Sequence, residues 1–264
     1  APARLNASGV SDLLGKYICL VDWKIAHMLT DEYICNEIIE LEEMALRTVR
    51  SCIVDIAQGD KESCEKLMYA LILSGLAMQM VGNSRPASCA EHHLSHLWEM
   101  EVINGPLDAL HGEKVSVATM IVLKEYKRIA RAIREGRCRV HAEWKDDSGL
   151  LEETFGRKNL LEGIIEENTP ELLEKVSPAR LESCLPEIAD LIELTGSYEV
   201  FLNHPASTAS KDLVKCKVGV DVLSVDSACR HELHLCVRSC HSFDHVDSAS
   251  LLSREEFNNI KAKG

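Results

Sequence analysis

The chain has 264 residues, 46% of them hydrophobic, and it carries a formal net charge of -13 with a pI near 5.3. This length suffices for one large helical domain with a buried core or for two smaller domains. The acidic charge argues against nucleic acid and anionic membrane surfaces as partners, because both attract basic stripes. We find no apolar run that spans a bilayer and no signal-peptide pattern, so we expect no membrane insertion and a cytoplasmic protein.

Eleven cysteines are scattered along the chain without a CxxC pair. Such scatter fits buried free thiols better than a zinc ribbon or a disulfide framework. We therefore expect a reducing compartment.

Helical periodicity dominates the first part of the chain. Residues 1–9 are expected to be a linker, and helices are predicted over residues 11–27, 36–56 and 60–80, where apolar residues recur every three or four positions. The third of these is apolar nearly all round towards its end, which predicts a place at the centre of the core.

A turn-rich segment, residues 82–88, precedes a histidine-rich helix. Its glycine and proline break any helix. Ser88 with Glu91 three residues later has the spacing of a capping box, so we predict a helix capped by Ser88. His92 and His96 then share one face of that helix.

The chain turns again at Gly105-Pro106, and His111-Gly112-Glu113 is predicted to open a long helix that ends near Gly136. Shorter helices broken by prolines are expected over residues 150–194, and the segment KVGVDVL further on suits either strand or helix. No sustained alternation of apolar and polar residues indicates a sheet. We therefore predict an all-α helical bundle, with the core and site in residues 10–135 and peripheral helices in residues 136–264.

Asp12, His92 and His111 have the chemistry of a metal site. Imidazole and carboxylate groups bind divalent transition metals, and three protein ligands with an open position make a catalytic site. Ligands from separate helices are typical of sites inside helical bundles. Simpler interpretations exist: Asp12 can complement the dipole at a helix N-terminus, and paired histidines are more often hydrogen-bonded surface groups. Spacing alone leaves both interpretations open.

The segment Ser84-Arg85-Pro86-Ala87-Ser88 offers hydroxyls, backbone amides and a guanidinium beside a helix start, a combination that suits a phosphate. Arg85 can equally pair with an acidic surface group. Lys16 lies one helical turn after Asp12. A further group of histidines near the end of the chain is interpreted as exposed; it comprises His231, His234, His241 and His245.

The motifs GNSRPAS-x-AEHHLSH (residues 82–96) and LHGEKV (residues 110–115) resemble the bacterial glycerol-1-phosphate dehydrogenases, within the superfamily of iron-containing alcohol dehydrogenases, glycerol dehydrogenases and dehydroquinate synthases. SGVSDLLGKYICLVDWK (residues 8–24) is similar to that family's SG-x-x-D helix. The resemblance implies that Asp12, His92 and His111 bind a divalent metal, zinc first, with nickel or iron as alternatives. It also implies that His96 lines the cleft near the substrate and nicotinamide.

In that family an α/β domain that binds NAD(P) precedes a helical domain that carries the metal. This sequence has no glycine-rich phosphate loop after a strand, so we expect it to correspond to the helical domain, with the NAD(P)-binding domain absent from this chain. NAD or NADP would be bound through that other domain. Cys89 departs from the family, which usually has glycine at its position.

Three functions follow as hypotheses. The first is a metal-dependent, NAD(P)-linked oxidoreductase that interconverts dihydroxyacetone phosphate and sn-glycerol 1-phosphate, a small phosphorylated substrate. In it, His96 or a water relays the proton, while Arg85 and Lys16 contact the phosphate. The second is a truncated or divergent helical module without catalysis, and the third is a dehydrogenase of glycerol or another unphosphorylated polyol. A homodimer is left open.

Overall fold

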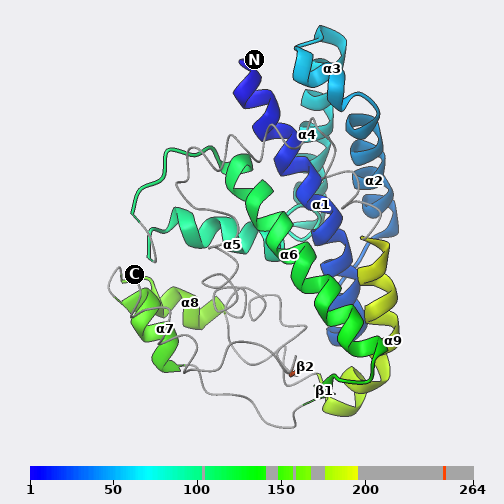
Figure 1. The fold of residues 1–264 in the computed structure, drawn as a ribbon, viewed down its shortest axis with the longest axis vertical. Helices are drawn as coiled ribbons and strands as arrows, with labels where there is room; N and C mark the ends of the chain where they lie inside the picture. The colour runs from blue at the N-terminus through cyan, green and yellow to red at the C-terminus, as the bar shows by residue number, and fades with distance from the viewer. Residues whose placement is uncertain (103–104, 141–147, 157–158, 168–175, 196–245, 248–264) are drawn as a thin grey trace.

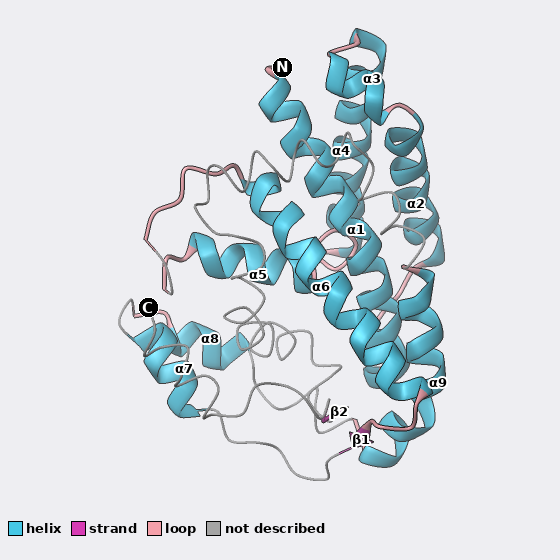
Figure 2. Ribbon diagram, in the orientation of Figure 1, coloured by secondary structure: helices cyan, strands magenta, loops and turns pink. Residues whose placement is uncertain are grey.

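The computed structural model describes residues 1–102, 105–140, 148–156, 159–167, 176–195 and 246–247, and this part is almost entirely helical (Figures 1 and 2). The helices are α1 (Ala3–Thr30), α2 (Asn36–Ser51), α3 (Ile53–Gln58), α4 (Lys61–Val81), α5 (Ala90–Glu99), α6 (His111–Arg134), α7 (Ser148–Phe155), α8 (Leu161–Glu167) and α9 (Pro178–Leu194). Two-residue strands β1 (Arg139–Val140) and β2 (Val246–Asp247) pair antiparallel. The all-α prediction is confirmed for these residues.

The helix α1 is the centre of the bundle. It contacts α2, α3, α4, α5, α6 and α9, and Figure 1 shows α6 running alongside it. Most residues of α1 are buried, and Leu13, Ile18, Trp23 and Leu29 are fully buried. A helix that is buried over most of its surface lies inside the core of its domain. The segment around Asp12 is thereby held rigidly by its neighbours.

Both ends of α1 differ from the predicted segment 11–27. The helix begins at Ala3, so residues 3–9 are helical rather than a linker. At its other end, Arg180 of α9 donates to the carbonyl oxygen of Met28 (2.7 Å) and to Asp31 Oδ1 (2.7 Å). The bond to Met28 satisfies one of the backbone carbonyl groups that a helix C-terminus leaves without partners, and the bond to the Asp31 carboxylate holds Arg180 in place.

The helix α9 lies in the stretch that was expected to be peripheral. Its residues Leu181, Ile188, Ala189 and Ile192 are buried, and α9 packs against α1 and α6. Proline at position 178 opens this helix, and the side chain of Ser177 accepts a hydrogen bond from the backbone of Arg180. Within the described residues, α9 therefore completes the core.

The helix α4 is less central than its composition predicted. Leu67, Ala70, Leu73 and Ala77 are buried on one face, while the opposite face is open. Among the described residues α4 is also the one helix that is long and apolar enough to cross a membrane, judged by length and composition alone. The expectation that no such segment exists is thus corrected for α4.

Several sequence expectations lie outside the described residues. These are the KVGVDVL segment and the histidine group that comprises His231, His234, His241 and His245.

Candidate metal centre

Three helices bring one carboxylate and two imidazoles to a single point. Asp12 comes from α1, His92 from α5, and His111 is the first residue of α6. One ligand atom from each lies within 4.8 Å of the other two. The His92 and His111 ring centroids are 5.3 Å apart, and His96 lies 5.6 Å from His111 and 6.0 Å from His92. The residues that the motifs singled out therefore converge.

Gly112 and Glu113 explain how the start of α6 reaches α1. A Cβ atom on Gly112 would overlap the carbonyl oxygen of Ser8, so only glycine permits this approach of the two backbones. The Glu113 carboxylate accepts hydrogen bonds from the backbone N–H of Leu110 (2.8 Å) and from Arg4 Nε (2.7 Å). The HGE motif thus fixes the position of its own histidine against α1.

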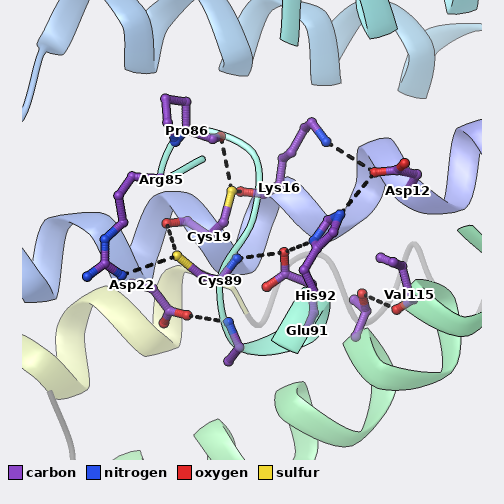
Figure 3. A network of polar contacts seen from close by, with 12 residues as sticks. Asp12, Lys16, Cys19, Asp22, Arg85, Pro86, Cys89, Glu91, His92 and Val115 are labelled. Atoms are coloured by element: carbon purple, nitrogen blue, oxygen red, sulfur yellow. Dashed lines mark hydrogen bonds and ion pairs between the residues drawn. The ribbon is translucent and has the colours of Figure 1, made fainter. Parts of the chain in front are cut away.

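His92 is oriented by a buried carboxylate on the neighbouring residue. Its Nδ1–H donates to Glu91 Oε1 (2.7 Å), and its Nε2 faces Asp12 Oδ1 at 3.3 Å (Figure 3). Burial lowers the pKa of His92, but the bonds to Asp12 and Glu91 outweigh this and raise it to about 9. A histidine held at Nδ1 by a carboxylate has Nε2 available as a metal ligand, the usual arrangement in protein metal sites.

Asp12 is surrounded by cationic groups. Burial raises its pKa, but the hydrogen bond with His92 and the charges of Lys16, His92 and His111 bring it well below the usual range. Lys16 Nζ lies 3.3 Å from Asp12 Oδ1, and this lysine is buried. Asp12 is therefore an ionised carboxylate, as a metal ligand must be.

Glu99 forms the far side of the histidine group. His111 Nδ1–H donates to Glu99 Oε1 (2.9 Å), and Lys114 Nζ donates to the same oxygen (3.0 Å). Burial raises the pKa of Glu99, but the hydrogen bonds from His111 and Lys114 lower it by more. The net shift is downward, so the Glu99 carboxylate is ionised. His96, Glu99 and His111 also approach closely enough to share a cation. Burial and the charge of His92 lower the pKa of His96, which is therefore neutral near pH 7.

Arg85 and Lys16 occupy different places relative to this centre. Lys16 contacts Asp12 directly, whereas Arg85 lies at the opposite end of the network in Figure 3. Arg85 Nη2 donates to Glu32 Oε2 (3.0 Å), and its Nε lies 2.6 Å from Glu32 Oε1. Lys16 therefore lies at the candidate metal centre. Arg85 pairs with the acidic side chain of Glu32, as the alternative interpretation of Arg85 expected.

The histidine helix begins later than its capping-box spacing predicted. The backbone amides of Ala87 and Ser88 both bond to the carbonyl oxygen of Ser84 (2.9 Å each), which forms the turn that precedes the helix. The helix α5 then begins at Ala90, and Asp22 of α1 accepts a hydrogen bond from its first amide (3.2 Å). Ser88 is therefore not the cap.

Glu91, Glu99 and Asp22 are the residues that sequence reasoning missed. Glu91 was interpreted only as a capping residue, yet its carboxylate holds His92. Asp22 is buried and also accepts a hydrogen bond from the Tyr126 hydroxyl. Burial raises the pKa of Asp22 to about 7. Glu99 carried one sequence signal, since it lies three residues after His96 and so shares its helix face.

The donor set fits a divalent metal. It combines one ionised carboxylate with two imidazoles, each of which has its Nδ1 bonded to a further carboxylate. All three ligand residues come from packed helices, so their positions depend on the core rather than on loops. The set has three protein ligands, which leaves room in the coordination sphere for a substrate oxygen.

Comparison with known proteins agrees with the motifs. A glycerol-1-phosphate dehydrogenase (NAD(P)+) of Halalkalibacterium halodurans is 45% identical over 132 residues, which is 50% of this chain and 33% of the relative. The protein of the same name from Geobacillus thermodenitrificans is 34% identical over 194 residues, 73% of this chain and 46% of the relative. That of Methanothermobacter thermautotrophicus is 35% identical over 142 residues, 54% of this chain and 40% of the relative.

No family model matches the chain. The chain spans between a third and about half of the length of these curated relatives. Their names agree with the family that the SRPAS and HGE motifs indicated. The chain is therefore related to the glycerol-1-phosphate dehydrogenases.

Proposed function

We propose that this chain supplies the metal and substrate site of an NAD(P)-linked dehydrogenase that interconverts sn-glycerol 1-phosphate and dihydroxyacetone phosphate. The observation that carries the proposal is the convergence of Asp12, His92 and His111 on one point between α1, α5 and α6. The names of the relatives supply the substrate class and the nicotinamide cofactor.

Asp12, His92 and His111 would hold the metal, for which zinc is proposed first and nickel or iron are the alternatives. When bound, such a metal acts as a Lewis acid on a hydroxyl or carbonyl oxygen. Glu91 keeps the proton of His92 on Nδ1, and Glu99 does the same for His111. Nε2 of His92, which faces Asp12, would have to lose its proton for a metal to bind there, since the pKa of His92 is about 9.

His96 is the proposed proton relay. Its ring lies within 6.0 Å of both ligand histidines, centroid to centroid. As a neutral imidazole it can accept the hydroxyl proton of the alcohol while hydride leaves the carbon for the nicotinamide. In the reverse direction the protonated ring donates a proton to the former carbonyl oxygen of the substrate while hydride from the nicotinamide reaches the carbon.

Lys16 is the first proposed contact to the substrate phosphate, and Arg85 is the second. Lys16 is buried beside Asp12, and a metal on the Asp12 carboxylate would compete with it for that oxygen. The ammonium would then be available to an anionic substrate. Arg85 would have to exchange Glu32 for phosphate, since Glu32 now holds its guanidinium on two sides.

Substrate binding tests this assignment without requiring turnover. The metal-loaded protein is titrated with sn-glycerol 1-phosphate and with glycerol, in parallel with Lys16→Met, Arg85→Ala and the surface control Lys24→Met. We expect Lys16→Met to weaken the phosphorylated ligand at least tenfold more than glycerol, with the control unchanged. Equal losses on both ligands would refute the phosphate role of Lys16. Failure of the wild type to bind either ligand would refute the proposed substrate class.

The cofactor is tested after the NAD(P)-binding domain of a relative has been joined to the N-terminus of the metal-loaded chain. Oxidation of NADH and NADPH is followed with dihydroxyacetone phosphate as the acceptor, and the wild type is compared with His96→Gln. We expect the variant to retain metal and to lose activity mainly in kcat, because a relay acts on the reacting proton. An unchanged kcat would contradict the assignment of His96.

A further inference from the structure

The imidazole of His96 lies beside the candidate metal centre without being one of its three ligands. Its ring centroid is 5.6 Å from that of His111 and 6.0 Å from that of His92. Within the part of the chain that the structure describes, no side chain hydrogen-bonds to either ring nitrogen of His96. A partly buried imidazole in this position can offer a nitrogen lone pair to a ligand.

Glu99 and His111 complete a group around this ring. Glu99 lies three residues after His96 on α5, so both side chains project from one helix face. Its Oε1 accepts the His111 Nδ1–H at 2.9 Å. One ligand atom from each of the three residues lies within 4.8 Å of the other two. We call this group the outer cation site; it comprises His96, Glu99 and His111, and it shares only His111 with the candidate metal centre.

The spacing of these side chains is that of known metal ligands. A glutamate and a histidine three residues apart on one helix supply metal ligands in helical-bundle proteins. Two imidazoles on one tetrahedral zinc ion, with Zn–N bonds of about 2.1 Å, have ring centroids about 5 Å apart. The 5.6 Å between His96 and His111 is close to this value and to the 5.3 Å between His92 and His111. We propose that the outer cation site binds a second divalent transition metal once the candidate metal centre is filled.

The outer cation site should be the weaker of the two sites. Its Glu99 and His111 side chains are 30% and 38% exposed, whereas that of His92 is only 7% exposed. Glu91 supports His92 at Nδ1, but no described carboxylate hydrogen-bonds to the His96 ring. Loss of such support typically weakens a metal site by about 10- to 100-fold. The candidate metal centre therefore fills first, and an ion at the outer cation site should be lost on a desalting column.

Lys114 limits the affinity of the outer cation site. Its Nζ donates, at 3.0 Å, to the same Glu99 oxygen that accepts the His111 bond. An incoming ion would displace this ammonium from the oxygen and replace the proton on His111 Nδ1, which goes to the solvent. Because Lys114 competes for a ligand atom and repels the ion as a like charge, its removal should strengthen binding at this site.

The donor set selects the class of ion. Two imidazoles and one carboxylate favour zinc, nickel or copper, whereas magnesium and calcium prefer sites made of oxygen ligands. A second ion would also occupy the His96 nitrogen that the proposed proton relay needs, so excess zinc should inhibit the dehydrogenase. This inhibition rests on the proposed function, but the binding of the ion does not.

Zinc titration of the full chain tests the outer cation site directly. Isothermal titration measures the number and strength of the binding events, and NMR of the imidazoles identifies the residues that each event affects. We expect a tight event that shifts the signals of His92 and His111, followed by an event about 10- to 100-fold weaker that shifts the signal of His96. Mg²⁺ at the same concentrations should leave the His96 signal unchanged.

Three variants separate the outer cation site from the candidate metal centre. His96→Gln should retain the tight event and lose the weaker one, because only the outer cation site uses this ring. Lys114→Met should tighten the weaker event by at least about tenfold, since it removes the competing ammonium. His27→Gln, at an exposed histidine of α1, is the matched control and should leave both events unchanged. Circular dichroism of each variant verifies the fold.

Three results would overturn the proposal. These are a His96 signal that does not respond to zinc after the tight event, a weaker event that persists in His96→Gln, and a His96 signal that responds equally to Mg²⁺. A different result would separate this proposal from the proposed function. If the His96 signal responds to zinc while that of His92 does not, the metal role of His92 is refuted and the outer cation site is supported.

Discussion

Replacing Glu91 with glutamine is the most revealing change at the candidate metal centre. Glu91 is fully buried, and its Oε1 accepts the His92 Nδ1–H at 2.7 Å. A glutamine of the same shape carries no charge, so it supports the imidazole proton less strongly. It can also turn its amide towards Nδ1 and donate, which would move the ring proton to Nε2. A proton on Nε2 removes the lone pair with which His92 would bind a metal.

The expected magnitude follows from the role of such outer carboxylates. Their loss typically weakens metal affinity by about 10- to 100-fold, or about 1.4 to 2.8 kcal/mol. The full burial of Glu91 places this site towards the upper end of that range. Isothermal titration with Zn²⁺ measures the affinity, with Glu43→Gln on the outer face of α2 as the matched control. NMR of the imidazole should show a lower pKa for His92, since the bond to Glu91 is one of its causes.

Two results would refute this reasoning about Glu91. Zinc affinity unchanged within twofold in Glu91→Gln would show that the carboxylate does not support the ligand. An equal loss in Glu43→Gln would show that the effect is one of general charge. Thermal unfolding without metal distinguishes a misfolded variant from a weakened site.

Two other predictions concern stability. Gly112→Ala should lower the free energy of unfolding by about 3 kcal/mol or more, because its Cβ would overlap the backbone of Ser8 and force α6 away from α1; urea unfolding of this variant within about 1 kcal/mol of the wild type would contradict the predicted clash. Burial raises the pKa of Glu42 from its usual value near 4.5 to about 7, so the folded state favours the neutral carboxyl and loses stability as pH rises through this window. The variant Glu42→Gln has no carboxyl to ionise and should not lose stability in this way. Between pH 4.5 and pH 7, its free energy of unfolding should rise relative to that of the wild type by up to about 3 kcal/mol. A pH-independent difference would contradict the buried-carboxylate explanation.

The helices near the site were largely predictable because their signals are local. Apolar periodicity places α1, α4 and α6, and glycine follows the ends of α4 and α6. The single helix predicted over residues 36–56 is divided at Cys52 into α2 and α3. The start of α5 was not predictable from its capping-box spacing, because Asp22, which accepts a hydrogen bond from its first amide, lies 68 positions earlier in the chain. The linker expected at residues 1–9 was wrong for a similar reason. Contacts with α6, visible only in the fold, bury Ser8 and extend α1 to Ala3.

The candidate site was predictable in its ligands and less so in their surroundings. Asp12, His92 and His111 stand out by residue type and motif, and the fold brings them together. Their role as metal ligands stays a prediction. Glu91 and Glu99 carry no distinctive sequence pattern, because a glutamate on a helix is most often a solvated surface residue. The open face of α4 was missed because composition does not tell which apolar residues a neighbouring helix covers.

Metal content is the most direct test of the central claim that Asp12, His92 and His111 form a metal centre. The purified chain and His111→Ala are each loaded with excess Zn²⁺, passed over a desalting column and analysed by mass spectrometry. We expect close to one zinc ion per chain in the wild type and nearly none in the variant, with the helical content of both unchanged. A wild type that retains no zinc, or a variant that retains as much as the wild type, would contradict this claim.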